Sequence, residues 1–489
     1  MLQRSILGLA FIICAIAEAC RHGQQYMTSD DDEHNRRHMH TKDGQEEWGY
    51  VTVRENAHMF WWLYNYPAGA AHMKKPRPGT SSGSLNNDER NTAASTTPLV
   101  LWLQGGPGGS GTGFGNFAEI GPLDISLKMR STTWLKSASL LFVDNPVGTG
   151  YSYVTDPGAY AKTVDQIAED LVTLFIQLYQ QKPELENAPL FIFSESYGGK
   201  MAAVFAVHLW KAVQKGLINA KFRGVAMGDS WVHPEMIVHS WGLYLYSTSL
   251  IDKPGLQIVN QAANNISRAI QDENWTAATE LWDAAEGIVG SVTDGVDWYN
   301  ILNPLNSHSS RLRQSRKLLH QSRLISNHAI KNLYERRMAV HQNDALDDLM
   351  NGPIRQKLKI IPGNVTWGGQ SSEVFANQAE EFMKPVVNSV DYLLNNTALK
   401  VVVYNGQLDL ICDSIGVEAW VSQLHWPGLP DFITARRIPL TLDTSDYVVG
   451  FSKQYKTFSF YWMLRGGHML PADQGQASLR MLNSILFSK

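Results

Sequence analysis

Between residues 99 and 227 the sequence alternates short apolar runs with longer amphipathic segments, and this alternation restricts the possible folds more than any other feature. The apolar runs predict strands, because they are short, rich in branched and aromatic residues and bounded by polar residues or glycine. They are Leu99–Leu103, Ser139–Val143, Leu190–Phe193 and Phe222–Met227. Val164–Leu178, with apolar residues at helical spacing, and Gly199–Lys215 are predicted helices. Strands that alternate with helices predict a mostly parallel sheet flanked by helices on both faces.

After the last of these strands the alternation stops. From residue 231 to residue 382 the pattern is helical and irregular, and strand-like runs resume at Leu399–Tyr404 and Phe458–Leu464. We therefore predict one α/β core in two parts, residues 48–230 and 383–489, interrupted by a largely helical cap at residues 231–382. A chain of 489 residues is long enough for a single large domain with such an insertion.

Residues 1–19 have the pattern of a secretory signal peptide that is cleaved from the mature protein. Arg4 precedes an apolar run from Ile6 to Ala17, and the small residues up to Ala19 offer a cleavage site. The run is too short to span a bilayer, and no later segment reaches about 18 uninterrupted apolar residues, so we expect no membrane association. The predicted mature protein begins with a polar segment, residues 20–47, and enters the secretory pathway to be secreted or delivered to lysosomes.

The composition is that expected of a secreted protein that does not bind nucleic acid. The net charge is −4, and no basic stripe interleaved with aromatic residues is present. Because Cys14 lies in the signal peptide, only Cys20 and Cys412 remain, which gives neither a disulfide framework nor a zinc-binding spacing. Four Asn-x-Ser/Thr sequences predict N-glycosylation. Their acceptor residues are Asn265, Asn274, Asn364 and Asn395.

Four further segments complete the organisation. Tyr50–Val53 and Met59–Tyr64 are rich in β-branched and aromatic residues and predict two more strands around a short turn. Residues 68–98 contain hardly any large apolar residue, so we predict an exposed insertion loop. The segment Arg311–Arg337 is basic; a solvated helix or loop is the favoured interpretation, and a proteolytic processing site is the alternative.

A serine at the end of a predicted strand is the candidate nucleophile. The strand Leu190–Phe193 leads into Ser194-Glu195-Ser196-Tyr197-Gly198-Gly199, and a helix follows. A strand, a sharp turn with serine at its apex and a helix form a nucleophile elbow, which raises the serine above the sheet. The usual motif has glycine where this chain has Ser194, and serine is small enough to fit there. A serine in an ordinary strand–helix loop is the alternative for this motif taken alone.

Two more polar residues follow predicted strands. Asp409 comes after the strand that ends near Tyr404, and His468 comes after the last predicted strand. The chain order Ser, Asp, His is that of α/β-hydrolases. His468 would take the proton of Ser196 and return it to the leaving amine, while Asp409 would fix the tautomer and stabilise the charged imidazole. We therefore predict an α/β-hydrolase fold with these three residues as its catalytic triad.

The glycine-rich segment Gln104–Gly109 also follows a predicted strand. Its backbone N–H groups can approach a substrate and stabilise an oxyanion, with the N–H of Tyr197 as a second donor. The overlapping segment Gly106–Gly111 matches the dinucleotide pattern G-x-G-x-x-G. We reject that interpretation because no apolar-periodic helix is predicted to begin there, and because Asp144 lies farther on than the expected ~20 residues. No metal or cofactor signature is present in the sequence.

Several stretches resemble the serine carboxypeptidase family, from Trp48 nearly to the end of the chain, whereas residues 68–98 and the basic segment lie outside the resemblance. The stretches are WGYVTVRENAHMFWWLY, LWLQGGPGGSGTGFGNFAEIGPLD, LLFVDNPVGTGYSY, FIFSESYGGKMAA, VAMGDSW, NGPIRQKLKIIP, VVVYNGQLDLI and GGHMLPADQGQASLRML. The resemblance implies that Ser196 is the nucleophile, His468 the base and Asp409 the orienting acid. It also implies that Gly106 and Tyr197 supply the oxyanion N–H groups.

The resemblance further implies a site for the free C-terminal carboxylate of a peptide. The residues at the corresponding positions are Trp102, Gln104, Glu119 and Glu195. Gln104 stands where the family has asparagine, so its amide lies one methylene farther out. Members of the family generally carry several disulfides, for which this chain has almost no cysteine.

The expected function is hydrolysis of the C-terminal peptide bond of peptides and proteins through an acyl-enzyme, without a cofactor. Glu195 facing a substrate carboxylate would place two like charges together, so the pair should share a proton and bind best at acidic pH. Two alternatives remain open: an acyltransferase that uses the same triad, and a non-catalytic binding or scaffold protein. Tyr299 and Trp367 are candidates for the substrate pockets, with core packing as the alternative for both.

Overall fold

A computed structural model describes residues 26–28, 38–41, 45–67, 97–304, 344–442 and 445–487. The predicted signal peptide, nearly all of the predicted loop at residues 68–98 and the basic segment Arg311–Arg337 lie outside the described residues. Within the described ranges, no helix combines the length and the apolar character that crossing a membrane requires.

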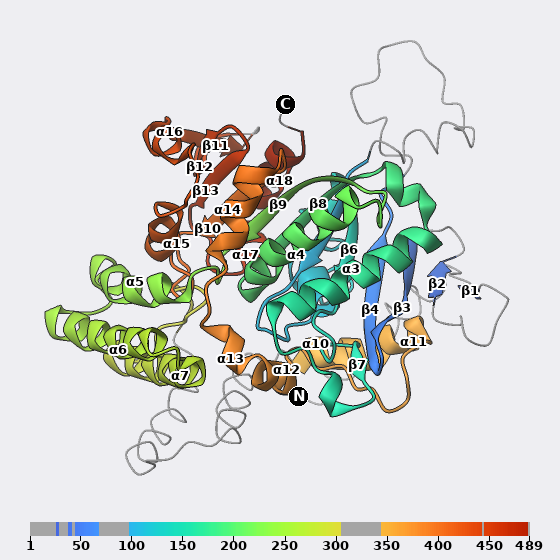
Figure 1. The fold of residues 1–489 in the computed structure, drawn as a ribbon, viewed down its shortest axis with the longest axis horizontal. Coiled ribbons are helices and arrows are strands. Elements are labelled where there is room, and N and C mark those ends of the chain that lie inside the picture. Colours follow the sequence, from blue (N-terminus) through green and yellow to red (C-terminus); the bar gives the residue numbers. More distant parts are fainter. Residues whose placement is uncertain are drawn as a thin grey trace, which may run out of the picture.

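One sheet of thirteen strands runs through the molecule (Figure 1). The strands are β1 (Tyr26–Thr28), β2 (His38–Thr41), β3 (Glu46–Arg54), β4 (Ala57–Tyr64), β5 (Leu99–Leu103), β6 (Ser139–Val143), β7 (Tyr153–Val154), β8 (Pro189–Glu195), β9 (Lys221–Gly228), β10 (Lys400–Gly406), β11 (Ile438–Leu442), β12 (Ser445–Tyr455) and β13 (Phe458–Met463). Their order is β1-β2-β3-β4-β6-β5-β8-β9-β10-β13-β12-β11, with β7 beside β4. The central strands from β6 to β13 pair in parallel, and both margins are antiparallel. The predicted α/β-hydrolase sheet is confirmed.

Helices cover both faces of this sheet. The α-helices are α3 (Val164–Gln181), α4 (Tyr197–Gln214), α5 (Pro234–Ser247), α6 (Lys253–Gln271), α7 (Trp275–Val292), α10 (Asp344–Leu349), α11 (Arg355–Leu358), α12 (Ser372–Asn377), α13 (Ala379–Phe382), α14 (Val387–Asn396), α15 (Ser414–Val421), α16 (Leu429–Thr434), α17 (Leu470–Asp473) and α18 (Gly475–Phe487). The other helical segments are η2 (Gly111–Ile120), η3 (Trp134–Lys136), η4 (Pro157–Ala159), η5 (Pro183–Asn187) and η6 (Met350–Ile354).

The strands and helices predicted before residue 230 are all present, with ends that differ by a few residues. The sequence pattern does not predict the antiparallel hairpin of β11 and β12 at one margin. β11 begins with the exposed residues Ile438 and Pro439 and has no regular alternation of buried and exposed positions. An edge hairpin of this kind lacks the buried face that makes a strand recognisable in sequence.

The alternation of side chains along β4 shows how the sheet separates two cores. Trp61 and Leu63 pack in the core that includes α3 and α4. Phe60, Trp62 and Tyr64 pack in the core on the opposite face, which includes α18. Because successive strand residues point to opposite faces, a strand that is apolar at every position lies between two helical layers. Both faces are therefore buried, as the sequence predicts.

Between β9 and β10 the chain forms helices. Figure 1 shows α5, α6 and α7 as a group beside the sheet, and α6 packs against both of the others. In the described parts of residues 231–382, the only β pairing is an isolated bridge between Gln370 and Gly109. This bridge fastens the segment before α12 to the glycine-rich loop after β5. The bounds of the cap remain a prediction.

Candidate active site

Ser196 lies at the turn between β8 and α4. Its backbone has φ 62° and ψ −131°, a sparsely populated conformation for a residue with a side chain. The turn approaches the neighbouring loop so closely that a Cβ on Gly105 would lie 2.4 Å from the Cβ of Ser196. A Cβ on Gly198 would lie 2.2 Å from the carbonyl oxygen of Leu103. The glycines on both sides are therefore required for the elbow to stand at the end of the sheet.

Ser194, in place of the usual glycine, fits within the sheet. Its side chain is completely buried, and its hydroxyl donates to the carbonyl oxygen of Ala226 at 3.2 Å. Serine in place of glycine at position 194 therefore adds a hydrogen bond to the neighbouring strand, and the nucleophile elbow still forms.

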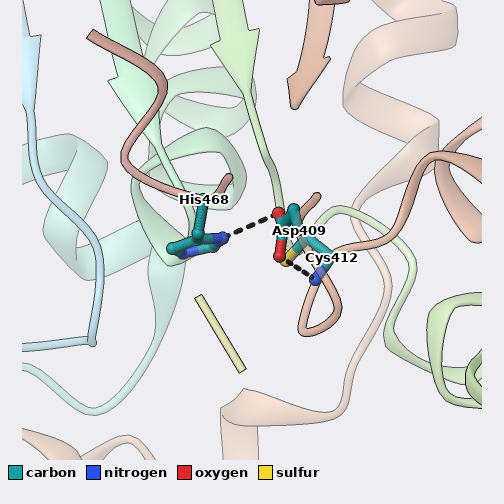
Figure 2. A group of neighbouring side chains, drawn as sticks. All are labelled: Asp409, Cys412 and His468. Atoms are coloured by element: carbon teal, nitrogen blue, oxygen red, sulfur yellow. Dashed lines mark hydrogen bonds and ion pairs between the residues drawn. The ribbon is translucent and has the colours of Figure 1, made fainter. Parts of the chain in front are cut away.

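His468 and Asp409 form a buried pair (Figure 2). The imidazole Nδ1 lies 2.8 Å from Asp409 Oδ2, and the backbone N–H of Cys412 donates to the other oxygen at 3.1 Å. The backbone N–H of His468 donates to the carbonyl oxygen of Tyr299 at 2.6 Å, and the Tyr299 ring packs edge-on against the imidazole. With Nδ1 directed at Asp409, the second ring nitrogen, Nε2, is left for proton exchange with a nucleophile.

Cys412 lies next to this pair, as Figure 2 shows. Its thiol is free and buried. Burial, and then the negative charge of Asp409, raises the pKa of the thiol well above its usual range. The sulfur therefore stays protonated and is a poor nucleophile, which leaves Ser196 as the candidate.

Ser196 and His468 line one cavity of about 310 Å³, to which Gly106 and Tyr197 also contribute. Among the contacts of the described residues there is no hydrogen bond between Ser196 Oγ and His468. Catalytic hydrogen bonds of this type commonly close only when the substrate is bound. The structure thus places all three predicted triad residues at one end of the sheet. Of the two hydrogen bonds expected within the triad, the bond between His468 and Asp409 is formed and the bond between Ser196 and His468 is not.

The loop that carries Gly106 is held by the segment before α12. Gln370 donates from Nε2 to the carbonyl oxygen of Pro107 at 2.7 Å. Gly106 has φ 114°, and a Cβ there would lie 2.3 Å from Gln370 Nε2. Position 106 therefore admits glycine alone. Gly106 and Tyr197 both line the cavity.

The predicted carboxylate-binding residues form a buried chain. Trp102 Nε1 donates to Gln104 Oε1 at 2.7 Å, and Gln104 Nε2 donates to Glu195 Oε1 at 2.8 Å. Gln104 and Glu195 line the cavity with Ser196. The longer side chain of Gln104 is thus compatible with an ordered network that ends at Glu195.

Glu119 belongs to the same network through Glu195. Burial, and then the charge and hydrogen bond of Glu119, raises the pKa of Glu195 well above its ordinary value. Burial also raises the pKa of Glu119, and the contact with Glu195 lowers it. The amide of Gln104 also lowers the pKa of Glu119, whereas Oε2 of Glu195 has no N–H or O–H donor among the described residues. The two carboxyl groups therefore share a proton, which Glu195 donates.

The segment Gly106–Gly111 differs in one respect from its predicted structure, because a helical segment, η2, does begin at Gly111. Its first turn is occupied by the buried carboxylate of Asp144. That carboxylate accepts from the backbone N–H of Thr112 at 3.1 Å and from the hydroxyls of Ser110 and Thr112 at 2.6 and 2.8 Å. The position that a nucleotide phosphate would take is filled by the protein's own acid, which supports the rejection of a nucleotide site.

Several cavity residues were not identified from the sequence. Trp231, Trp282 and Phe382 line the cavity together with Tyr299, whereas Trp367 is buried and donates to Ser110 Oγ. Of the two aromatic candidates, Tyr299 thus borders the site and Trp367 is a packing residue. Trp231 follows β9 within the stretch VAMGDSW, and its place after a parallel strand is the signal that would have identified it.

The chain is similar to known serine carboxypeptidases along most of its length. Residues 38–488 match the family model described as serine carboxypeptidase. The chain is 48% identical over 450 residues to human retinoid-inducible serine carboxypeptidase, covering 91% of this chain and 92% of that protein. It is 41% identical over 451 residues to serine carboxypeptidase-like 51 of Arabidopsis thaliana, with the same coverage. A prohormone-processing carboxypeptidase of Saccharomyces cerevisiae, Kex1Δp, has a similar fold, with a TM-score of 0.69, 18% identity and 90% of each chain covered.

Proposed function

This chain belongs to the serine carboxypeptidase family, and on that premise we propose that Ser196, His468 and Asp409 hydrolyse the C-terminal peptide bond of peptides and proteins. The observation that carries the assignment of these residues is the buried hydrogen bond from His468 to Asp409, in the cavity that Ser196 lines. Apart from the water molecule that is consumed, the chemistry needs no group beyond the side chains and backbone of this site.

The proposed reaction has two halves. Ser196 Oγ attacks the scissile carbonyl while His468 Nε2 takes its proton, and the backbone N–H groups of Gly106 and Tyr197 stabilise the oxyanion. His468 then gives the proton to the leaving amino acid as the C–N bond breaks. Water attacks the resulting acyl-enzyme with His468 again as the base, and Ser196 is regenerated.

We further propose that the network of Trp102, Gln104, Glu119 and Glu195 binds the C-terminal carboxylate of the substrate. A substrate carboxylate beside Glu195 accepts a hydrogen bond from the protonated carboxyl of Glu195. Binding therefore requires Glu195 to keep its proton. As the pH rises and the proton is lost, like charges face one another and KM increases. This supports an acidic working pH, as the sequence predicts.

The predicted acceptor asparagines support passage through the secretory pathway and a mature protein that is secreted or lysosomal. Asn274, Asn364 and Asn395 are exposed, and Asn265 is half-buried on α6.

We expect glycans on the three exposed residues. Digestion of the secreted protein with an N-glycosidase should lower its apparent mass, and replacing the three residues with Gln should abolish nearly all of that change. An unchanged mass after digestion of the wild type would contradict the expectation.

The decisive experiment measures release of the C-terminal amino acid from N-blocked dipeptides, with secreted wild type and Ser196→Ala compared from acidic to neutral pH. We expect release by the wild type alone, and none from peptides whose C-terminus is amidated. Labelling of Ser196 by a fluorophosphonate separates the alternatives. Labelling without release would favour acyl transfer, whereas neither labelling nor release would favour the non-catalytic binding protein.

A further inference from the structure

Asp229 lies directly after β9, between the strand that leads to Ser196 and the strand that leads to Asp409. It is completely buried, with φ 45°. Its backbone N–H donates to the carbonyl oxygen of Tyr404 at 2.9 Å, and its Oδ1 accepts from the backbone N–H of Gly406 at 2.6 Å. Both contacts hold Asp229 at the end of β10, where the turn that carries Asp409 begins.

The second oxygen of Asp229, Oδ2, has no N–H donor within the described part of the chain. The carboxyl group of Asp409 lies within hydrogen-bonding reach of the Asp229 carboxyl. Asp409 already accepts from His468 Nδ1 and from the backbone N–H of Cys412. Two ionised carboxylates in contact and out of water are strongly unfavourable, so one of them carries a proton. The Asp409 carboxylate accepts two hydrogen bonds and that of Asp229 only one, so Asp409 is the better-stabilised anion and the proton belongs to Asp229.

The surroundings of Asp229 favour the same protonation state. The titratable groups that face it are, besides Asp409, the carboxyls of Glu119 and Glu195, the hydroxyl of Tyr404 and the thiol of Cys412. None of these groups gains a positive charge; His468, which is hydrogen-bonded to Asp409, does so when it takes the proton of Ser196, and it then stabilises the Asp409 anion. Burial, and then the charge of Asp409, raises the pKa of Asp229 well above its ordinary value.

We infer that Asp229 is a positioning residue for the catalytic triad: in its neutral form its O–H donates a hydrogen bond to Asp409 and fixes that carboxylate in the orientation that His468 requires. The inference rests on the proposed function of the triad. When Asp229 loses its proton, the two carboxylates repel each other and the hydrogen bond to His468 is disturbed. Activity then falls at higher pH through kcat, independently of the binding of a substrate carboxylate.

Asp229→Asn tests this directly, because its amide accepts from Gly406 and donates to Asp409 without titrating. The substrate is p-nitrophenyl acetate, which has no C-terminal carboxylate and therefore does not report on Glu119 and Glu195. At acidic pH we expect the kcat of Asp229→Asn to lie within about 3-fold of the wild-type value. As the pH rises, the variant should lose its kcat at a pH about one unit or more above the pH at which the wild type loses it. Asp229→Val, which offers no donor, should lose about 100-fold in kcat, the scale of a misplaced catalytic group.

The matched control is Asp413→Asn, another buried aspartate near the triad, whose carboxyl accepts from Ser240 and caps α15. Its pH profile on the ester should equal that of the wild type. An Asp229→Asn enzyme with the wild-type loss of kcat at high pH would overturn the inference, even if the valine variant did not fold. Absence of Ser196-dependent ester hydrolysis in the wild type would instead overturn the proposed function, and the inference with it.

Discussion

At the scale of single residues, the chemistry of this site depends on where protons lie among buried carboxyl groups. Glu119 and Glu195 form one such pair, and Asp229 and Asp409 form another. All four residues are buried, so each pair holds a proton at a pH where exposed carboxyls have lost theirs. In the proposed function the first pair faces the substrate carboxylate, and the second lies beside His468. The first should therefore control binding, and the second the chemical step.

Glu195→Gln should flatten the dependence of peptide KM on pH. Glutamine keeps a donor for the substrate carboxylate and cannot ionise, so peptide binding should no longer weaken as the pH rises. The measurement is KM, separated from kcat, for an N-blocked dipeptide from acidic to neutral pH, with the variant of a half-buried glutamate, Glu186→Gln, as the control. Retention of the wild-type pH profile by Glu195→Gln would count against the role of the shared proton.

Gln104→Asn restores the residue expected from the family resemblance, and in this chain it should weaken peptide binding. The shorter side chain cannot reach both Trp102 Nε1 and Glu195 Oε1, which lie 2.7 and 2.8 Å from its two polar atoms. Loss of one hydrogen bond to a charged or proton-sharing group costs about 1.5 kcal/mol or more, equivalent to roughly a 10-fold higher KM. Hydrolysis of p-nitrophenyl acetate should be unchanged. Equal peptide KM values for the two enzymes would show that Gln104 does not set the carboxylate geometry.

At the scale of elements, α4 joins the nucleophile to a wall of the cavity. Lys200, one turn after Ser196, is completely buried, and its Nζ donates to the carbonyl oxygens of Glu381 and Lys384 at 2.5 and 2.6 Å. It also donates to the carbonyl of Phe382, whose ring stacks on that of Tyr197 at 5.7 Å and lines the cavity. The end of α13 is thus held by the helix that presents the nucleophile.

Lys200→Met should destabilise the protein and raise peptide KM. Methionine fills the space but donates to none of the three carbonyls, and each buried acceptor left without a donor costs about 1–3 kcal/mol. Thermal unfolding measures the first effect, and dipeptide hydrolysis the second. Lys211→Met, on an exposed face of the same helix, is the control for loss of a lysine. A melting temperature as high as that of the control would contradict the role of Lys200.

At the scale of the whole molecule, stability comes from the two cores on either side of the sheet. Cys412 is the cysteine of the described part of the chain, and it is free, so no disulfide bond joins the described residues. The buried acids add a dependence on pH. Burial raises the pKa of Asp413 to about 7, and it raises the pKa of Asp229 and Glu195 as well.

The sign of that dependence follows from proton binding. Below about pH 4 these carboxyls are protonated in both the folded and the unfolded protein. Above it the unfolded chain ionises while the folded chain keeps its protons, so the free energy of unfolding falls as the pH rises toward 7. Burial lowers the pKa of His233, which opposes this trend below about pH 6.5. The pKa of Lys200, lowered by burial to about 7, affects stability only above that pH.

The melting temperature should therefore be several degrees higher at about pH 5 than at about pH 7.5, because each carboxyl contributes about 1.4 kcal/mol per unit of pKa shift. Asp413→Asn should reduce the difference, since it removes one of the titrating acids and keeps the helix cap. Calorimetry at the two pH values measures both effects. A wild type that melts at the higher temperature at pH 7.5 would show that the histidine and other groups outweigh the buried acids.

The sequence alone determined the sheet and the residues at its end. Strand periodicity is local, and parallel strands bring their carboxyl ends to one edge, so Ser196, Asp409 and His468 could be placed together from chain order. The elbow could also be predicted, because its glycines are adjacent to the serine in sequence. The edge hairpin of β11 and β12 could not, since it has no regular buried face.

Only the tertiary structure decided which carboxyl groups share protons and which helix holds the cavity wall. The contact of Glu119 with Glu195 depends on how η2 packs against β5 and β6, beside β8, and that of Asp229 with Asp409 depends on the pairing of β9 with β10. The three carbonyls that accept from Lys200 lie more than 180 residues farther along the chain. Periodicity and local motifs do not encode such distances, because they arise from the packing of elements that are remote in sequence.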